Sequence, residues 1–219
     1  MKAKSFTLEA VAWDPWLAPV ATATATPKQR AALDASPQAN SPYFRTLAHD
    51  VDSLAERSPL FHSVMYVPRG LKRAERELAT VVVSIINGCI YCSSVHARRF
   101  AELTKQPDVI QALYDQGLDT PLPARLRAIV DYAAKLTREP AAMTVADLKP
   151  LREVGMDDLE ILDLTNAAAQ SLVTHALGLC DTATSSCCGS DVFVGILCGP
   201  SPSDGSCCYV ALTQTRSCL

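Results

Sequence analysis

The chain has 219 residues, of which 48% are hydrophobic and 20% are charged, a composition close to the globular average that excludes wholesale disorder. The formal net charge of −3 leaves no excess of lysine and arginine to neutralise a phosphate backbone, so we expect no nucleic acid partner. No apolar run reaches the ~18 residues of a spanning helix, and Glu9 and Asp14 interrupt the N-terminal region too early for a signal peptide. We therefore expect a cytoplasmic protein without a membrane span, in which cysteines stay reduced unless they react.

Helical periodicity dominates the chain from residue 41 to about residue 179. Residues 1–40 are rich in alanine, threonine and proline and predict an extended arm with one short helix near 27–34. From residue 41 to about 179, apolar residues recur at spacings of three and four, which predicts an all-α domain of six to eight helices. The strongest helix, 73–86, is apolar on nearly all sides and is expected at the centre of the fold. Further helices are predicted at about 41–65, 89–104, 107–117, 123–138, between Thr144 and Gly155, and from Asp157 onward.

A change in composition marks the last 40 residues. Seven of the nine cysteines lie between residues 180 and 218, in a segment rich in serine, glycine and proline. Their spacings match no metal site or disulfide framework that we recognise. We predict an irregular tail over 180–219 and hypothesise that the reading frame was lost near residues 170 to 180, the alternative being a genuine extension of the chain.

The other two cysteines form a C-x-x-C motif, Cys89 and Cys92, followed by His96. Residues four apart in a helix are neighbours, about 5–6 Å between Cβ atoms, so protonated His96 would favour a thiolate at Cys92. The positive end of the helix would act in the same direction. A regular helix would hold the two sulfurs too far apart to bond, so we expect a disulfide only if Cys89 lies at a relaxed helix start, for which Gly88 supplies the freedom.

Glu77 can join this group only if the chain reverses direction at Asn87-Gly88. In one unbroken helix Glu77 would lie about 22 Å from Cys92 along the axis. A reversal would instead place it beside His96 on a packed neighbouring helix, where a buried carboxylate sets the tautomer and basicity of the imidazole. The predicted site is therefore Glu77, Cys89, Cys92 and His96.

The spacing Glu77-x11-Cys89-x-x-Cys92-x3-His96 resembles the AhpD-like alkylhydroperoxidase branch of the carboxymuconolactone decarboxylase family. The resemblance extends over about residues 41–169 and includes Glu75-Arg76-Glu77-Leu78-Ala79, Val83-Ser84 and Asn87-Gly88. It implies an all-helical AhpD-like bundle and a homo-oligomer, a trimer or hexamer. Some members carry a second histidine directly before the second cysteine, where this chain has Tyr91.

The resemblance also implies a role for each residue of the site. Cys92 would be the peroxidatic cysteine, Cys89 the resolving one, and His96 with Glu77 a proton relay. The chain would then be a thiol-dependent peroxidase of the antioxidant type, with an organic hydroperoxide as substrate. A dithiol would reduce the resulting disulfide, and in the best-known branch that donor is a protein-bound lipoyl group.

Several alternatives stay open on the residues alone. The two cysteines could be inert core residues or half of a zinc site, although residues 1–179 hold no second C-x-x-C. Glu77 could belong to an exposed charge cluster. The chain could be a decarboxylase-like lyase, whose branch lacks the cysteine pair, or a non-enzymatic redox or binding module. We expect no metal, because His49, His62 and His175 have no companion ligands at metal spacing, and no cofactor, because no nucleotide-binding glycine loop is present. The segment from Trp13 to Trp16 could clamp a neighbouring subunit or pack on its own domain.

Overall fold

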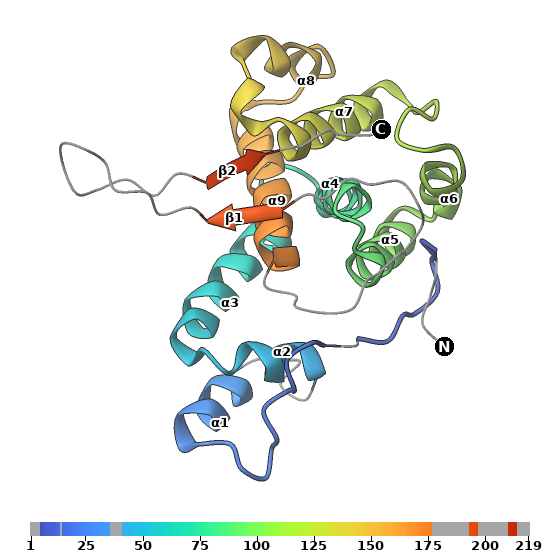
Figure 1. The fold of residues 1–219 in the computed structure, drawn as a ribbon. Helices are drawn as coiled ribbons and strands as arrows, with labels where there is room; N and C mark the ends of the chain where they lie inside the picture. Colours follow the sequence, from blue (N-terminus) through green and yellow to red (C-terminus); the bar gives the residue numbers. More distant parts are fainter. Residues whose placement is uncertain (1–4, 14, 36–40, 177–192, 197–209, 214–219) are drawn as a thin grey trace, which may run out of the picture. The chain divides into compact units, whose positions relative to one another are not determined.

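The computed structural model describes residues 5–13, 15–35, 41–176, 193–196 and 210–213 (Figure 1). The chain divides into two compact units, residues 1–184 and 185–219. In the second unit, strands β1 (Phe193–Ile196) and β2 (Val210–Thr213) pair antiparallel. The hypothesis of a lost reading frame depends on the segment after residue 176, which lies outside the described residues, and the domain boundaries expected at residues 40 and 179 stay predictions.

The described residues of the first unit form an all-helical fold, as the sequence predicts. None of these helices is long and apolar enough to cross a membrane. Two 3₁₀ turns, η1 (Pro140–Ala142) and η2 (Val145–Leu148), precede α8. The nine α-helices of the described residues are α1 (Pro27–Asp34), α2 (Pro42–Leu47), α3 (Val51–Tyr66), α4 (Arg73–Ile86), α5 (Ile90–Thr104), α6 (Pro107–Gln116), α7 (Ala124–Arg138), α8 (Lys149–Glu153) and α9 (Asp158–Ala176).

Capping side chains decide where several helices begin. Thr26 forms a capping box with Gln29, and α1 starts at the predicted residue. Residues 41–176 hold eight α-helices, α2 to α9, within the six to eight expected, although residues 42–66 form two helices where one was expected. The Asp50 side chain accepts a hydrogen bond from the Ser53 amide and starts α3 anew after a short break.

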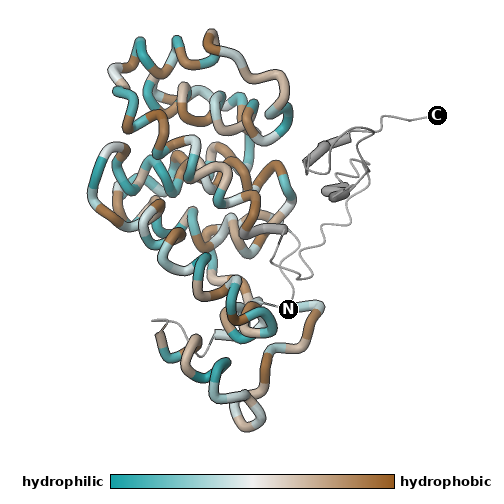
Figure 2. The backbone as a smooth tube through the Cα atoms, turned by 90° about the vertical axis from the view of Figure 1, so that its left-hand side faces the viewer, coloured by the Kyte–Doolittle hydropathy of each residue, from teal (hydrophilic) through white to brown (hydrophobic). Residues whose placement is uncertain are grey.

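Helix α4 lies at the centre of the helical domain, packed against α5, α7 and α9 (Figure 1). Every residue from 75 to 84 is buried. Hydrophobic and hydrophilic residues alternate along the surrounding helices (Figure 2), as expected for amphipathic helices that share one core. The predicted central position of this helix is confirmed, so its side chains reach several partner helices at once.

The chain reverses between α4 and α5, as the site requires. Gly88 adopts a left-handed conformation with φ +70°, which favours glycine, and Asn87 ends α4. The amide of Cys89 donates a hydrogen bond to the carbonyl of Ser84 at 2.9 Å, which closes the turn. Helix α5 then packs along α4 rather than extending it.

Three consecutive charged residues of α4 are buried and point toward three different helices. Glu75 accepts hydrogen bonds from Arg125 of α7, and Arg76 pairs with Asp163 of α9. Glu77 faces α5. Successive helical residues are rotated by about 100°, so a central helix distributes neighbouring side chains around its axis. Each charge therefore links α4 to a different neighbouring helix.

The guanidinium of Arg76 is enclosed by acceptors. It lies 2.9 Å from the carboxylate of Asp163, and both side chains are nearly inaccessible. It also donates to the backbone carbonyls of Val64, Val67 and Arg69, which joins the end of α3 and the following loop to α4. Because the charge of Arg76 is buried, removal of Asp163 would leave it uncompensated, and this loss would lower the stability of the fold strongly.

Replacing Asp163 by asparagine should strongly destabilise the fold. The substitution keeps the shape but leaves the buried Arg76 charge uncompensated, so we expect the free energy of unfolding to fall by about 3 kcal/mol. Urea denaturation followed by circular dichroism measures this change. The control is Asp131→Asn, because Asp131 is well exposed and pairs with Arg127 one turn away on α7; its effect should stay within about 0.5 kcal/mol. Equal effects of the two substitutions would contradict the prediction.

Candidate active site

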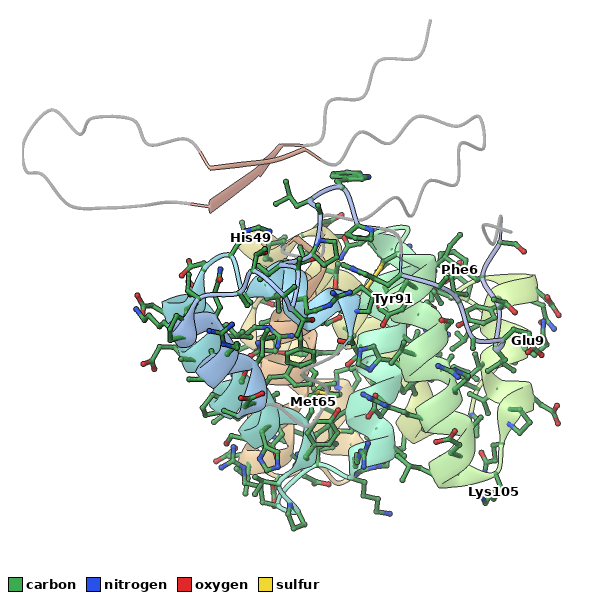
Figure 3. All side chains as sticks on the ribbon, turned by 90° about the horizontal axis from the view of Figure 1, so that it is seen from below. Phe6, Glu9, His49, Met65, Tyr91 and Lys105 are labelled. Atoms are coloured by element: carbon green, nitrogen blue, oxygen red, sulfur yellow. A yellow bond between two sulfur atoms is a disulfide. The ribbon has the colours of Figure 1, made fainter. Side chains whose placement is uncertain are left out.

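Cys89 lies at the start of α5 rather than within it. It is the N-cap residue, with extended backbone, and its Sγ accepts a hydrogen bond from the Cys92 amide at 3.2 Å. The two sulfurs are bonded as a disulfide, with Cα atoms 5.4 Å apart, beside Tyr91 (Figure 3). The relaxed helix start that a disulfide needs is therefore present.

The two sulfur-bearing residues differ in accessibility. Cys89 is only 1% exposed, whereas Cys92 is half-buried. An external reagent thus meets Cys92 first, while Cys89 is buried at the start of α5. Geometry alone gives the pair an outer and an inner member.

His96 is held by Glu77 across the reversal. Its Nδ1 lies 2.6 Å from Oε2 of Glu77, and both side chains are buried. With the carboxylate ionised, Nδ1 carries the proton and donates it, so Nε2 is left as the basic nitrogen. Oε1 of the same carboxylate lies 3.4 Å from Nε of Arg73, one turn earlier on α4. Of the four predicted residues, the structure pairs Glu77 with His96 and Cys89 with Cys92, and Cys92 precedes His96 by one turn of α5.

Opposing effects act on the pKa of Glu77. Burial alone would raise it, because a carboxylate loses its hydration inside the protein. The hydrogen bond from His96 and the positive charges of His96, Arg99 and Arg73 outweigh burial, so the pKa lies below its usual value. Glu77 is thus held as an anion. In this state it can orient the ring of His96 and stabilise the protonated imidazolium.

A further layer under the carboxylate comes from Tyr66, at the end of α3. Its hydroxyl accepts a hydrogen bond from Arg99 at 2.9 Å, and the guanidinium of Arg73 lies 4.6 Å from the ring centroid. Both arginines therefore stay close to Glu77. Sequence reasoning missed this layer, and no spacing signal could have found it, because Tyr66 precedes a loop whose path is not periodic.

The N-terminal arm packs on its own domain, next to the cysteines. The ring of Trp13 meets Tyr91, the residue between the two cysteines, edge to face with centroids 4.9 Å apart. It also contacts Tyr43 of α2 at 5.1 Å. Of the two arrangements open for this segment, the structure has the one within the same chain.

A second contact of the arm lies on the other side of Cys92. Ser93 shares a hydrogen bond with the hydroxyl of Tyr114 on α6 at 2.8 Å, and the ring of Phe6 stacks on Tyr114 at 5.6 Å. Burial raises the pKa of Tyr114 to about 12, although the Ser93 hydrogen bond opposes this. Tyr114 therefore stays neutral at physiological pH and serves as a structural donor or acceptor.

The arrangement favours thiol chemistry over metal binding. No group of three or more histidine, cysteine, aspartate or glutamate side chains that could hold a metal ion occurs among the residues described. What the site offers instead is a disulfide-forming pair with an accessible member and, one helical turn beyond Cys92, an imidazole oriented by a carboxylate. An imidazole oriented in this way can ionise a thiol, receive its proton and return it.

Comparisons with known proteins point to one family. The model of the carboxymuconolactone decarboxylase family matches residues 55–135, which include all four site residues. A crystal structure of an uncharacterized peroxidase-related protein from Silicibacter sp. TM1040 is 33% identical, with a TM-score of 0.55 over 60% of this chain and 69% of that one.

A second similar structure is described as an alkylhydroperoxidase AhpD core, an uncharacterized peroxidase-related protein from Ralstonia eutropha JMP134. It is 26% identical, with a TM-score of 0.63 over 76% of this chain and 89% of that one. No curated protein matches.

The lowered pKa of Glu77 predicts a pH dependence of stability. The unfolded residue titrates near 4.5, and its folded pKa is lower, so the carboxylate adds stability above pH 4.5. This contribution is lost as the pH falls from 4.5 through the folded pKa. Glu77→Gln should therefore show a shallower loss of unfolding free energy below pH 4.5 than the wild type, measured by urea denaturation at a series of pH values.

Glu102→Gln is the matched control for this experiment, because Glu102 is exposed on α5, the helix that carries His96. That variant should keep the wild-type slope. An unchanged slope in Glu77→Gln would show that the carboxylate does not gain its ionisation from the folded state.

Proposed function

This chain belongs to the carboxymuconolactone decarboxylase family, among its AhpD-like, peroxidase-related members, and we propose that it is a thiol-dependent peroxidase that reduces organic hydroperoxides. The observation that carries the proposal is the Cys89–Cys92 disulfide at a helix start, with the buried Glu77–His96 pair one turn beyond its accessible sulfur. A lyase would leave this disulfide without a role. The proposal includes a homo-oligomer in the cytoplasm, a trimer or hexamer, acting in antioxidant defence.

The first step consumes the peroxide. His96 takes the proton of Cys92 at Nε2, and the thiolate attacks the terminal oxygen of the hydroperoxide. The O–O bond breaks, the hydroxyl stays on sulfur as a sulfenic acid, and the alkoxide leaves. The alkoxide receives the proton from His96 and departs as an alcohol, so sulfur is oxidised and the peroxide reduced.

The second step forms the disulfide. The thiol of Cys89 attacks the sulfenic sulfur of Cys92, an S–S bond forms, and the hydroxyl leaves with the proton as water. A dithiol donor, such as a protein-bound lipoyl group, then gives two electrons and two protons to restore both thiols and becomes a disulfide itself. The 5.4 Å Cα separation allows this closure without a large movement of the backbone.

The two cysteines are assigned by access and by hydrogen bonding. Peroxide and donor both reach Cys92 more easily, because Cys89 is nearly inaccessible. The Cys92 amide donates to the Cys89 sulfur, which would stabilise a thiolate there. Cys89 is therefore suited to be the leaving group when the donor attacks the disulfide at Cys92, since a stabilised thiolate leaves faster.

Single cysteine variants test the assignment. After reduction and treatment with cumene hydroperoxide, Cys89→Ser should accumulate a sulfenic acid at Cys92, trapped with dimedone, whereas Cys92→Ser should show no oxidation at Cys89. Trypsin cleaves after Arg76 and Arg98, so one peptide, residues 77–98, contains both cysteines and none from the tail. Mass spectrometry of that peptide excludes the other seven thiols. Equal labelling of both variants would refute the proposed roles.

The imidazole should matter most at neutral pH. Lowering the pKa of a thiol from about 8.5 to about 6.5 raises its ionised fraction at pH 7 roughly 25-fold. His96→Ala should therefore slow oxidation of Cys92 about that much at pH 7, with a rate that climbs toward the wild-type value above pH 9. Stopped-flow oxidation of the Cys89→Ser background at several pH values measures this. A uniform loss at all pH values would assign His96 a merely structural role.

A further inference from the structure

The N-terminal arm contacts one neighbour of Cys92, Tyr91, directly and reaches the other, Ser93, through Tyr114. On one side the ring of Trp13 rests against Tyr91, and on the other Phe6 stacks on Tyr114, which is hydrogen-bonded to Ser93. A stretch of only eight residues, 6–13, thus carries both contacts. The contacts are aromatic, so the arm brings apolar surface to the residues that flank the accessible sulfur.

The indole of Trp13 has an unused donor. Its Nε1–H is buried and has no hydrogen-bond partner among the described residues. Leaving a buried donor unpaired costs about 1–3 kcal/mol, so such groups are rare and call for an explanation. Because this nitrogen has almost no exposed surface, a ligand in this region would meet the ring of Trp13 rather than its N–H.

We propose that Trp13, with Tyr91 and Tyr43, forms an aromatic binding wall next to Cys92 that takes the aryl or bulky alkyl group of the substrate. Aromatic rings at this distance offer a face and an edge to a third apolar group. The wall makes Trp13 a specificity-determining residue that favours large organic hydroperoxides over hydrogen peroxide. This identification of the substrate class rests on the proposed function, but the binding wall itself does not.

The wall can be tested without peroxide. In a Cys89→Ser background, the reduced protein is treated with N-phenylmaleimide or N-ethylmaleimide, and labelling of Cys92 is followed in the peptide 77–98. The ratio of the two rates, divided by the same ratio for glutathione, cancels any change in thiol ionisation. It should exceed one in the wild type and fall about 3- to 10-fold in Trp13→Ala, the loss expected for one aromatic contact.

Two further variants separate the ring from other effects. Trp16→Ala removes the other indole of the arm, which is 69% exposed, and should leave the ratio unchanged. Trp13→Phe keeps an aromatic ring without the donor and should keep most of the phenyl preference. A wild-type ratio in Trp13→Ala, or an equal fall in Trp16→Ala, would overturn the binding wall.

The peroxide arm of the experiment compares oxidation of Cys92 by cumene hydroperoxide and by hydrogen peroxide. Trp13→Ala should lower the rate with cumene hydroperoxide about 3- to 10-fold and leave hydrogen peroxide nearly unchanged, and Trp13→Phe, which keeps a ring, should keep most of the cumene rate. Equal losses with both peroxides would overturn the specificity role. If the wild type reacts with neither peroxide, the proposed function fails, whereas the maleimide ratio still decides whether the wall exists.

Discussion

The site depends on one hydrogen bond that crosses a reversal of the chain. Glu77 and His96 lie nineteen residues apart, on helices that would form one rod if residue 88 could not adopt a left-handed conformation. The reversal shortens a separation of more than 20 Å along an axis to a contact of 2.6 Å. It also places Cys89 at a helix start, where the pair can close. Both the Glu77–His96 hydrogen bond and the disulfide therefore depend on the conformation of Gly88.

The burial of Glu77 makes this hydrogen bond consequential. A carboxylate in the centre of a helical core is costly unless paired, and here the partner is a titratable imidazole with two arginines nearby. The neighbours Glu75 and Arg76 are buried as well, each paired to another helix. The catalytic carboxylate of the proposed mechanism thus belongs to a set of ion pairs that also orders the bundle. Its position is set by the fold as a whole, which favours a preorganised site.

Much of the fold could be predicted from the sequence, because its signals are local. Proline and capping residues mark the starts of α1 and α6, and the apolar pattern of α4 gives its bounds without error. The reversal was predictable because glycine follows a helix end and the two halves of the motif make chemical sense only when folded together. The division between α2 and α3 was missed, since it rests on one capping aspartate within a continuous apolar pattern.

Other parts of the site have no signature in the sequence. Three charged residues in succession usually indicate a solvated face, and only the central position of α4 buries Glu75, Arg76 and Glu77. The docking of Trp13 on Tyr91 joins segments nearly eighty residues apart, one of them without periodicity. Long-range contacts of this kind depend on the packed surface, which exists only after the helices assemble.

The two sulfurs occupy environments that give the proposed cycle a direction. The inner sulfur, that of Cys89, lies at a helix start and accepts an amide hydrogen bond. Both features stabilise a thiolate, which suits a leaving group in disulfide exchange. The outer sulfur is reachable, lies one turn from the imidazole, and is flanked by aromatic rings. In the proposed cycle a peroxide from outside therefore meets Cys92, whose proton can be removed. A dithiol donor that attacks the disulfide at Cys92 releases Cys89, whose charge is stabilised. If both sulfurs were equally exposed, peroxide could oxidise either one, and the resolving thiol would have no protection from a second equivalent of oxidant.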